Sequence, residues 1–340
     1  MQTTAKHILI IRFSSLGDVA MTVPVVAAFL KAHPKHKISV LTKKQFAPLF
    51  VHLKNVEVIG VDLNVDYKGF WGLIQLSKKI KSLKVDAIAD LHNVLRTKVL
   101  RLLLLAHKWS VLDKGRLEKK QLISGTIFKP LRPMVERYAD VIRSLGFDFS
   151  LENPSFSKRI PLSKHIALIL KTNAKPYIGI APFAAYASKT YPIEKIKKVI
   201  NSLSESKCTL ILFGGGQKEG EQLRLLAKKY DNVISVAGQF SLEEELQLMS
   251  HLNVMLAMDS GNAHMAAMMG VKVLTLWGVT HPYSGFAPFH QPLENCLLAD
   301  RNQFPKIPTS VYGNQYPKGY EKAMESIPED LVVKAVQKAL

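Results

Sequence analysis

The chain has 340 residues, of which 47% are hydrophobic, and its 46 Lys and Arg against 27 Asp and Glu give a formal net charge of +19. This length and apolar content predict a globular protein of two domains. Because no apolar run reaches about 18 residues, and Arg12 interrupts the first one, we expect neither a membrane-spanning helix nor a signal peptide, and hence a cytoplasmic protein.

Positive charge is concentrated in the first half of the chain. Residues 1–165 hold 28 Lys and Arg against 12 Asp and Glu, a net +16, whereas residues 166–340 hold 18 against 15, a net +3. The N-terminal half should therefore meet an anionic partner: nucleic acid, an anionic membrane surface or a phosphorylated substrate. The two cysteines, Cys208 and Cys296, predict neither a disulfide framework nor a metal site.

Apolar runs alternate with amphipathic stretches over the first 145 residues, which predicts a parallel, doubly wound βα sheet. The expected strands are residues 7–13, 38–41, 56–61, 85–91 and 109–112. The expected helices are residues 19–32, 45–53, 69–83, 95–106 and 133–145. The first of these helices tolerates Pro24 only if that proline lies in its first turn.

Residues 147–162 lose this periodicity and contain Pro154 and Pro161, so we place an interdomain linker there. The alternation then starts again. The second set of strands is 177–181, 209–213, 233–236, 254–258 and 271–277, and the longer helices are 193–203, 220–229, 242–251 and 328–340. We expect an N-terminal Rossmann-like domain (1–160), a C-terminal one (161–322) and a C-terminal helix (323–340). Ligands of open parallel sheets bind outside the carboxyl ends of the strands, which places the site in the interdomain cleft.

The turn Asp259-Ser260-Gly261-Asn262 follows an apolar strand and starts a short helix of small residues. Asp259 and Ser260 both favour a helix N-cap, and the first amides of the helix have no acceptor within it. Such a helix end attracts phosphate. The alternative is an ordinary capped helix in a parallel sheet.

The first βα turn reads Ser14-Ser15-Leu16-Gly17-Asp18. It lacks the Gly-x-Gly-x-x-Gly fingerprint, so it is poorly built to hold a pyrophosphate. Asp18 should lie at the carboxyl end of the first strand, where it either caps the next helix or acts as a general base. The missing fingerprint favours the base.

These two turns, in this order and about 240 residues apart, resemble those of glycosyltransferase family 9, the lipopolysaccharide heptosyltransferases. The resemblance implies a GT-B fold and an inverting transfer of a sugar from a nucleotide diphosphate donor, with no cofactor and no obligatory metal. The simplest donor is ADP-heptose. The acceptor would be a lipopolysaccharide core or related glycolipid at the inner face of the membrane.

The resemblance also implies roles for single residues. Asp18 matches the catalytic base, which accepts the proton of the acceptor hydroxyl as that oxygen attacks the anomeric carbon. Lys189, beside Ser188, matches the basic residue that neutralises the leaving diphosphate in place of a metal ion. The donor phosphates would meet the turn formed by Ser260, Gly261, Asn262 and Ala263.

The roles of two further residues and one loop on the donor side are less specific. His264 either contacts phosphate or packs within its helix. We interpret Asp259 as a cap and turn-former that at most reaches a sugar hydroxyl, because its charge repels phosphate. The loop of residues 182–186 departs from the family pattern, which leaves the second phosphate contact open.

The nucleoside should lie near Gly215 in a run of three glycines. Either Glu219 or Glu221 would bind the ribose, and the spacing from the glycines favours Glu219. Both could instead be ordinary carboxylates at a helix start. Phe240 would meet the base through its backbone, while its side chain packs as a hydrophobic staple.

The acceptor side is predicted in a basic stretch, residues 78–120, with 12 Lys and Arg against 4 Asp and Glu. Its segment 90–97 resembles the acceptor-side segment of the family. The acceptor-binding candidates are His92, Asn93 and Arg96, together with Ser14, Ser15 and Gly17 of the first turn. We expect a monomer that contacts the inner membrane surface peripherally, through charge. The alternative for the basic stretch is a solvated helix face.

Two other functions remain open from the sequence. A nucleotide-sugar epimerase or hydrolase could share the two-domain plan, but it would need partners for the single acid of the first turn. A nucleic-acid-binding protein is suggested by the basic half. Against that function, no binding motif is present and the basic residues lack interleaved aromatic residues. We therefore expect no nucleic acid among the partners.

Overall fold

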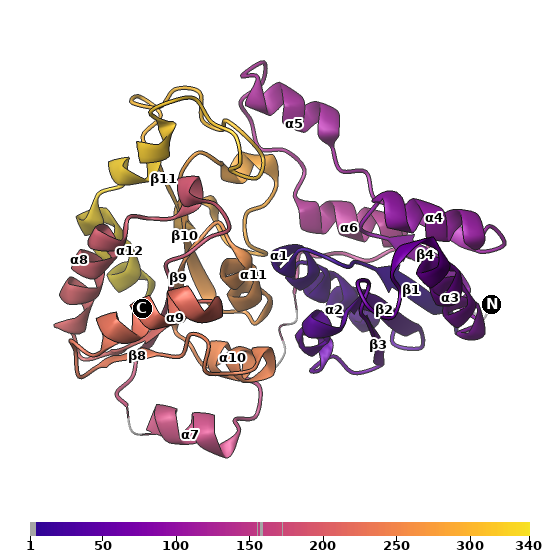
Figure 1. Cartoon of the computed structure of the whole chain (residues 1–340), viewed down its shortest axis with the longest axis horizontal. Helices are drawn as coiled ribbons and strands as arrows, with labels where there is room; N and C mark the ends of the chain where they lie inside the picture. The colour runs from indigo at the N-terminus through magenta and orange to yellow at the C-terminus, as the bar shows by residue number, and fades with distance from the viewer. Residues whose placement is uncertain (1–4, 155, 157–158, 172) are drawn as a thin grey trace. The chain divides into compact units, whose positions relative to one another are not determined.

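The computed structural model describes residues 5–154, 156, 159–171 and 173–340, and it contains two compact units (Figure 1). Unit 1 consists of residues 1–114 and 134–157, and unit 2 consists of residues 115–133 and 158–340. Residues 115–133 thus belong to unit 2 by their contacts, although they lie among the first 160 residues of the sequence.

Unit 1 is built on a five-stranded parallel sheet of order β3-β2-β1-β4-β5. Its strands are β1 (His7–Ile11), β2 (Lys37–Lys43), β3 (Val56–Val61), β4 (Ala87–Asp90) and β5 (Lys108–Val111). Its helical segments are α1 (Leu16–Ala20), α2 (Thr22–Ala32), η1 (Lys44–Phe50), α3 (Gly69–Ser82), α4 (Leu95–Leu103) and α6 (Met134–Arg143). The central strand β1 is apolar on both faces because helices cover both, and residues 8–11 are fully buried.

The five predicted strands of unit 1 are confirmed, but two helices differ from prediction. The single helix expected over residues 19–32 is divided at Met21 into α1 and α2, and Pro24 lies in the first turn of α2, where a missing N–H costs nothing. The stretch expected to be an amphipathic helix over residues 45–53 is the 3-10 segment η1, which contains Pro48.

Unit 2 is built on a six-stranded parallel sheet of order β11-β10-β9-β6-β7-β8. Its strands are β6 (Tyr177–Ala181), β7 (Thr209–Leu212), β8 (Val233–Ser235), β9 (Val254–Met258), β10 (Lys272–Trp277) and β11 (Cys296–Leu298). Its helices are α5 (Arg116–Ile123), α7 (Lys164–Lys171), α8 (Ile193–Ser204), α9 (Gly216–Ala227), α10 (Leu242–Met249), α11 (Gly261–Met268) and α12 (Glu329–Ala339).

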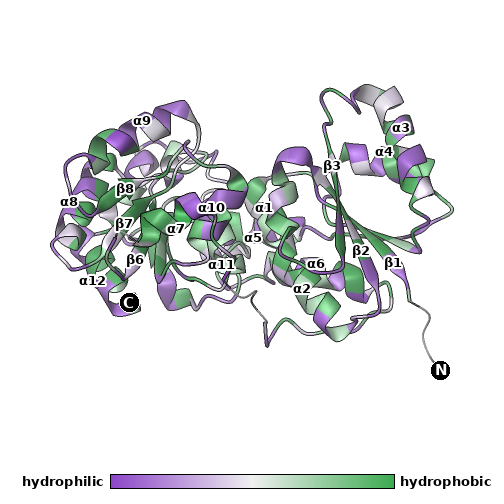
Figure 2. Cartoon of the chain, turned by 90° about the horizontal axis from the view of Figure 1, so that it is seen from below, coloured by the Kyte–Doolittle hydropathy of each residue, from purple (hydrophilic) through white to green (hydrophobic). Residues whose placement is uncertain are grey.

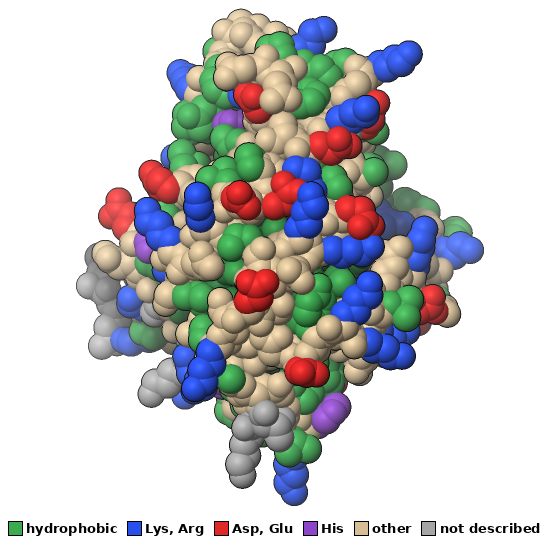
Figure 3. Space-filling view, turned by 90° about the vertical axis from the view of Figure 1, so that its left-hand side faces the viewer, with side chains coloured by type: hydrophobic (Ala, Val, Ile, Leu, Met, Phe, Trp, Pro, Cys, Tyr) green, Lys and Arg blue, Asp and Glu red, His purple; other side chains and the backbone are tan. Residues whose placement is uncertain are grey.

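The strands of both sheets are largely hydrophobic, whereas the helices mix hydrophobic and hydrophilic residues (Figure 2). The surface carries both signs of charge, and the face shown in Figure 3 has basic and acidic side chains intermingled. None of the helices in the described part of the chain is long and apolar enough to cross a membrane.

Both sheets have the same topological switch point. The chain starts each sheet in the middle, winds outward to one edge, and then returns to add strands on the other side, so β1 neighbours β4 and β6 neighbours β9. Loops that leave such neighbouring strands diverge at their carboxyl ends and leave room for a ligand. The predicted site residues Asp18 and His92 follow β1 and β4, and Lys189 and Ser260 follow β6 and β9.

Candidate functional site

A buried ion pair occupies the carboxyl edge of the unit 2 sheet. Lys189 Nζ lies 2.9 Å from Asp259 Oδ2, and the hydroxyl of Thr280 donates to the same oxygen at 2.9 Å. The side chains of Lys189 and Asp259 are only 12% and 9% exposed. The interpretation of Asp259 as a helix cap is wrong, because its carboxylate binds Lys189 and Thr280 while Ser260 is the N-cap residue of α11.

Two glycines allow the Lys189 loop to pack closely. The 3-10 turn η2 (Ala187–Lys189) follows β6, and a side chain at Gly278 would clash with the backbone of Ser188. A Cβ atom at Gly313, whose φ is +84°, would lie 2.7 Å from Lys189 Cγ. The buried hydroxyl of Ser188 donates to the carbonyl of Gly313 at 2.5 Å. Ser188 thus anchors the loop, and the Lys189 side chain is held in one place.

Helix α11 begins directly beside this ion pair in the sequence. The N–H groups of its first turn lack intrahelical acceptors, which makes this end positive. Ser260 Oγ is buried and has no hydrogen-bond partner among the described residues. Gly261 and Asn262 open the helix, whereas His264, one turn in, is buried. The edge therefore offers amides, a hydroxyl and a lysine, a set suited to a diphosphate.

The glycine run after β7 forms the start of α9, which begins at Gly216 rather than at the predicted residue 220. Glu219 accepts a hydrogen bond from the backbone N–H of Gly215 at 2.8 Å, and Glu221 accepts one from Gln217 at 3.0 Å. Glu219 is thus the acid that faces the glycine loop. A Cβ atom at Gly215 would meet nothing within 4 Å, so a ligand can approach the backbone there.

Phe240 precedes the N-cap of α10, as predicted, but it does not form a hydrophobic staple. The fourth residue of the helix is Glu245, which is not apolar, and the Phe240 ring instead packs on His165 with centroids 5.2 Å apart. Burial raises the pKa of Glu245 to about 7. Ser241 and Glu244 form the capping box that fixes the start of this helix.

Side chains of Arg12, Ser15 and Tyr138 hold the acid of the first turn in unit 1. Arg12 Nη2 lies 2.7 Å from Asp18 Oδ2, and the same oxygen accepts hydrogen bonds from the Ser15 backbone N–H at 3.1 Å and the Ser15 hydroxyl at 2.8 Å. The Tyr138 hydroxyl donates to Oδ1 at 3.2 Å. Asp18 therefore does cap α1, but it is also an 18% exposed carboxylate oriented by a buried arginine and a tyrosine. Gly17 lies buried within α1.

The predicted acceptor residues Ser14, His92 and Asn93 lie at the same edge of unit 1. Ser14 Oγ is 3.5 Å from His92 Nε2. The backbone N–H groups of His92 and Asn93 both donate to Asp90 Oδ1, at 2.9 and 2.8 Å, and the Asn93 amide donates to the Leu112 carbonyl. Asn93 has a φ of 47°, a left-handed conformation that Asn tolerates better than most residues. Arg96 is exposed in the first turn of α4.

Two histidines that are largely removed from water, the half-buried His92 and the buried His281, make the fold sensitive to acid. Burial and the nearby Arg12 lower the pKa of His92 to about 3, and burial together with Arg301 lowers the pKa of His281 to about 4. An unfolded chain protonates both near pH 6.5. Both therefore bind protons more readily when unfolded, so their contribution to stability is complete above pH 6.5 and is lost as the pH falls toward 4 for His281 and toward 3 for His92.

We expect the free energy of unfolding to fall by about 1.4 kcal/mol per pH unit for each of these two histidines in that window. Urea unfolding at pH 7 and pH 5 measures the change. A His281→Gln variant should lose less stability between the two pH values than the wild type loses. An equal loss in both proteins would show that His281 does not contribute to the acid sensitivity.

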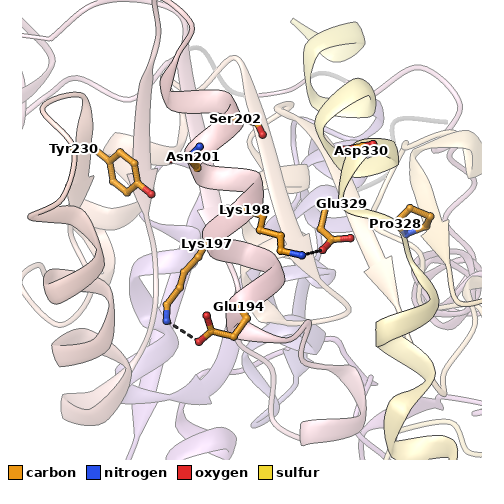
Figure 4. A pocket seen from close by; sticks show the side chains of 9 residues that line it. All are labelled: Glu194, Lys197, Lys198, Asn201, Ser202, Tyr230, Pro328, Glu329 and Asp330. Carbon is orange, nitrogen blue, oxygen red and sulfur yellow. Dashed lines mark hydrogen bonds and ion pairs between the residues drawn. The ribbon is translucent and has the colours of Figure 1, made fainter.

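A separate pocket lies between α8 and the start of α12 (Figure 4). Its two lysines are already paired with carboxylates: Lys197 with Glu194 at 2.7 Å and Lys198 with Glu329 at 3.0 Å. None of the predicted site residues lines this pocket. This pocket is therefore separate from the predicted donor-binding residues. Among the described residues, no group of three or more His, Cys, Asp and Glu is placed to hold a metal ion.

A model of the family described as glycosyltransferase family 9 (heptosyltransferase) matches residues 73–315. The chain belongs to this family. It is therefore a glycosyltransferase, and neither the epimerase nor the nucleic-acid-binding alternative is kept. The membership confirms the resemblance seen in the two turns, and the two parallel sheets confirm the prediction of two Rossmann-like βα domains.

Named relatives of this transferase agree with the family. The chain is 23% identical over 329 residues to a lipopolysaccharide core heptosyltransferase, OpsX, of Haemophilus influenzae, covering 95% of this chain and 89% of that protein. It is 24% identical over 336 residues to lipopolysaccharide heptosyltransferase 3 of Escherichia coli, covering 95% and 96%.

Solved structures of similar fold include family 9 members. A glycosyltransferase of this family from Veillonella parvula aligns with a TM-score of 0.76 at 20% identity, covering 100% of this chain and 98% of that one. The heptosyltransferase WaaC of E. coli with ADP aligns with a TM-score of 0.71 at 20% identity, covering 98% and 100%. At this identity the likeness concerns the fold of the transferase.

Sequence reasoning missed Arg12, Tyr138 and Thr280, the side chains that hold the two acids. Arg12 was noticed only because it interrupts an apolar strand. A charged residue that is the last but one of a buried run is itself a signal, because such a residue must find a partner. Tyr138 and Thr280 carry no comparable signal, since both lie far in sequence from the acids that they contact.

Proposed function

We propose that the chain catalyses an inverting transfer of heptose from ADP-heptose to a lipopolysaccharide core or related glycolipid at the inner face of the membrane. Unit 2 would bind the nucleotide donor, and unit 1 would supply the base and bind the acceptor. The observation that carries this proposal is the Lys189 side chain, fixed by Asp259 at the sheet edge where α11 begins.

The donor diphosphate would bind the first-turn amides of α11 and the Ser260 hydroxyl, whose buried oxygen needs a partner. Lys189 would neutralise the charge that develops on the leaving ADP, which is the contribution that a divalent metal ion makes elsewhere. Asp259 does not touch phosphate in this arrangement. It orients the lysine, and Thr280 orients Asp259. The ribose would lie at Glu219 and Gly215, and the base near the backbone of Phe240.

Asp18 would act as the general base in unit 1. Its contacts with Arg12, Ser15 and Tyr138 fix the orientation of the carboxylate, so that it can accept the proton of the acceptor hydroxyl as the C–O bond to the anomeric carbon forms and the bond to ADP breaks. The low pKa of His92 keeps this ring neutral near pH 7, so it can exchange a hydrogen bond with a sugar hydroxyl.

The acceptor side would combine Arg96, Asn93 and the basic surface that follows. Each basic residue close to an anionic leaflet contributes about 1 kcal/mol to membrane binding. The first half of the chain has a net charge of +16, so its electrostatic attraction to a phosphorylated glycolipid is large. The relatives named above are lipopolysaccharide heptosyltransferases, which supports an acceptor of this class.

Donor choice can be tested by thermal unfolding with ADP, UDP, GDP and their sugar conjugates. A ligand present at 100 times its dissociation constant stabilises the folded state by about 2.7 kcal/mol. We expect stabilisation by ADP and ADP-heptose, and none by UDP or GDP at equal concentration. Stabilisation by UDP or GDP forms alone would show that the donor is a UDP or GDP sugar rather than ADP-heptose. No response to any of these ligands would contradict the assignment of unit 2 as a donor domain.

A further inference from the structure

Large apolar side chains of unit 1 are exposed on two neighbouring helices. Phe70 and Trp71 in the first turn of α3 are 58% and 77% exposed, and Leu95 and Leu102 on α4 are 77% and 67% exposed. Leu105, just beyond α4, is 75% exposed. Single exposed apolar residues are common, but a group of this size on adjoining helices marks an interaction surface.

The two helices present these side chains on one layer of the unit. Both α3 and α4 follow strands of a parallel sheet and pack against each other (Figures 1 and 2). Their inner faces share one core, to which α3 contributes Leu73 and Leu76 and α4 contributes Leu100. The outer residues Leu95 and Leu102 are seven positions apart, so they point the same way from α4.

The apolar group lies near the acceptor edge. Helices that follow parallel strands begin at the carboxyl edge of the sheet, so Phe70, Trp71 and Leu95 lie at the same edge as His92 and Asn93. The rings of Phe70 and Trp71 contact each other, with centroids 6.1 Å apart. An aromatic pair beside a polar binding edge is the arrangement found where a protein meets the boundary between water and lipid.

The charge of the two helices distinguishes between the classes of partner that could cover them. Neither α3 nor α4 contains an acidic residue. The exposed basic residues on and next to them include Lys68, Lys78, Lys79, Lys81, Arg96 and Lys98, and the exposed acid Asp66 lies two residues before Lys68. A second copy of the chain would bring the same positive charges together and be repelled. Nucleic acid would leave the exposed leucines in water. An anionic lipid surface satisfies both the charges and the apolar side chains.

We propose that the outer face of α3 and α4 inserts Phe70, Trp71, Leu95 and Leu102 into the headgroup boundary of an anionic membrane. This inference rests on the proposed function and extends it, because the attachment is then apolar insertion as well as charge attraction. The lysines and arginines would lie against the lipid phosphates. The insertion would hold the acceptor edge of unit 1 at the depth where the sugar of a glycolipid leaves the bilayer.

Vesicle binding without donor or acceptor tests the insertion directly. The probe is Trp71, observed with vesicles of phosphatidylglycerol and phosphatidylethanolamine that carry brominated acyl chains, which quench indoles in the membrane. We expect quenching in the wild type, and its loss in Trp71→Phe even though that variant still binds. Because Trp277 is buried and Trp109 is half-buried, neither replaces the signal.

Paired variants separate insertion from charge. Trp71→Ser/Leu102→Gln leaves every charge in place, and we expect it to bind the vesicles at least about tenfold more weakly than the wild type. Leu225→Gln removes an equally exposed leucine from unit 2 and should bind like the wild type. Equal vesicle binding by the double variant and the wild type, or no quenching of Trp71, would overturn the insertion.

A transfer assay with a deacylated, water-soluble acceptor keeps this inference distinct from the proposed function. The double variant should retain wild-type turnover in that assay, since Trp71 and Leu102 lie outside the reacting groups. Turnover without vesicle insertion would leave the function standing and refute the membrane face. Vesicle insertion without turnover would support the membrane face and contradict the proposed function.

Discussion

The Asp18→Asn variant is expected to bind the nucleotide donor like the wild type and to lose about 10² to 10⁴ of the transfer rate. Asparagine keeps the shape of the aspartate, and its one amide oxygen can still accept hydrogen bonds from Ser15, but the amide does not accept the proton of the acceptor hydroxyl at neutral pH. Donor binding is measured by titration with ADP, and transfer by the release of ADP from the nucleotide sugar. Turnover within tenfold of the wild type would remove Asp18 from its assigned role.

Controls are needed because Asp18 also pairs with a buried arginine. Loss of the carboxylate leaves the Arg12 charge without its ion-pair partner, so we expect a lower free energy of unfolding as well. Tyr138→Phe removes one hydrogen bond to the carboxylate and keeps its charge. This variant should lose less than about tenfold of the transfer rate. If both variants fold and only Asp18→Asn is inactive, the lower transfer rate is due to the missing proton acceptor.

The Lys189→Met variant is expected to lose about 10² to 10³ of the transfer rate, because methionine can pack beside Gly313 as the lysine does but has no charge for the leaving diphosphate. It should also lose about 3 to 5 kcal/mol of stability. The reason is that the carboxyl group of Asp259, 9% exposed, would be left buried without its cation. Chemical denaturation and steady-state turnover measure the two effects separately.

The double variant Lys189→Met/Asp259→Asn distinguishes catalysis from folding. With both charges removed, most of the lost stability should return, since an amide can still accept the hydrogen bond of Thr280. Transfer should stay low. Recovery of the transfer rate together with stability would show that Lys189 acts only as a structural partner of Asp259, and the donor assignment would have to move elsewhere.

The strands, and the sheet edges at which the candidate site residues lie, could be predicted because buried parallel strands appear in the sequence as short apolar runs. Ten of the eleven strands in the described part of the chain were anticipated in this way, whereas β11, which follows a proline-rich stretch, was missed. The helices α5 and α7 were also missed, and the basic residues of α5 were interpreted only as charge. Helix boundaries shifted where capping decided them, as at Gly216.

The details of the candidate site could not be predicted, because they depend on which side chains meet in space. The pattern around Asp259 is that of a helix cap, and local chemistry gave no reason to prefer a lysine 70 residues earlier. The tertiary ion pair nevertheless determines where the carboxylate points. The same holds for Asp18, where capping, the alternative that the sequence did not favour, occurs together with contacts to Arg12 and Tyr138 that no local pattern contains.

The path of the chain between the two units limits how such enzymes can be recombined. Residues 115–133 leave unit 1 and pack in unit 2, where Lys119 lies 4.5 Å from the Phe286 ring and the Arg301 guanidinium lies 3.6 Å from the Phe128 ring. In a chimera of two relatives joined once, near residue 160, residues 115–133 would come from one relative and the unit 2 surface that they pack against would come from the other. An exchange of unit 1 between two relatives would therefore need three junctions, near residues 114, 133 and 157.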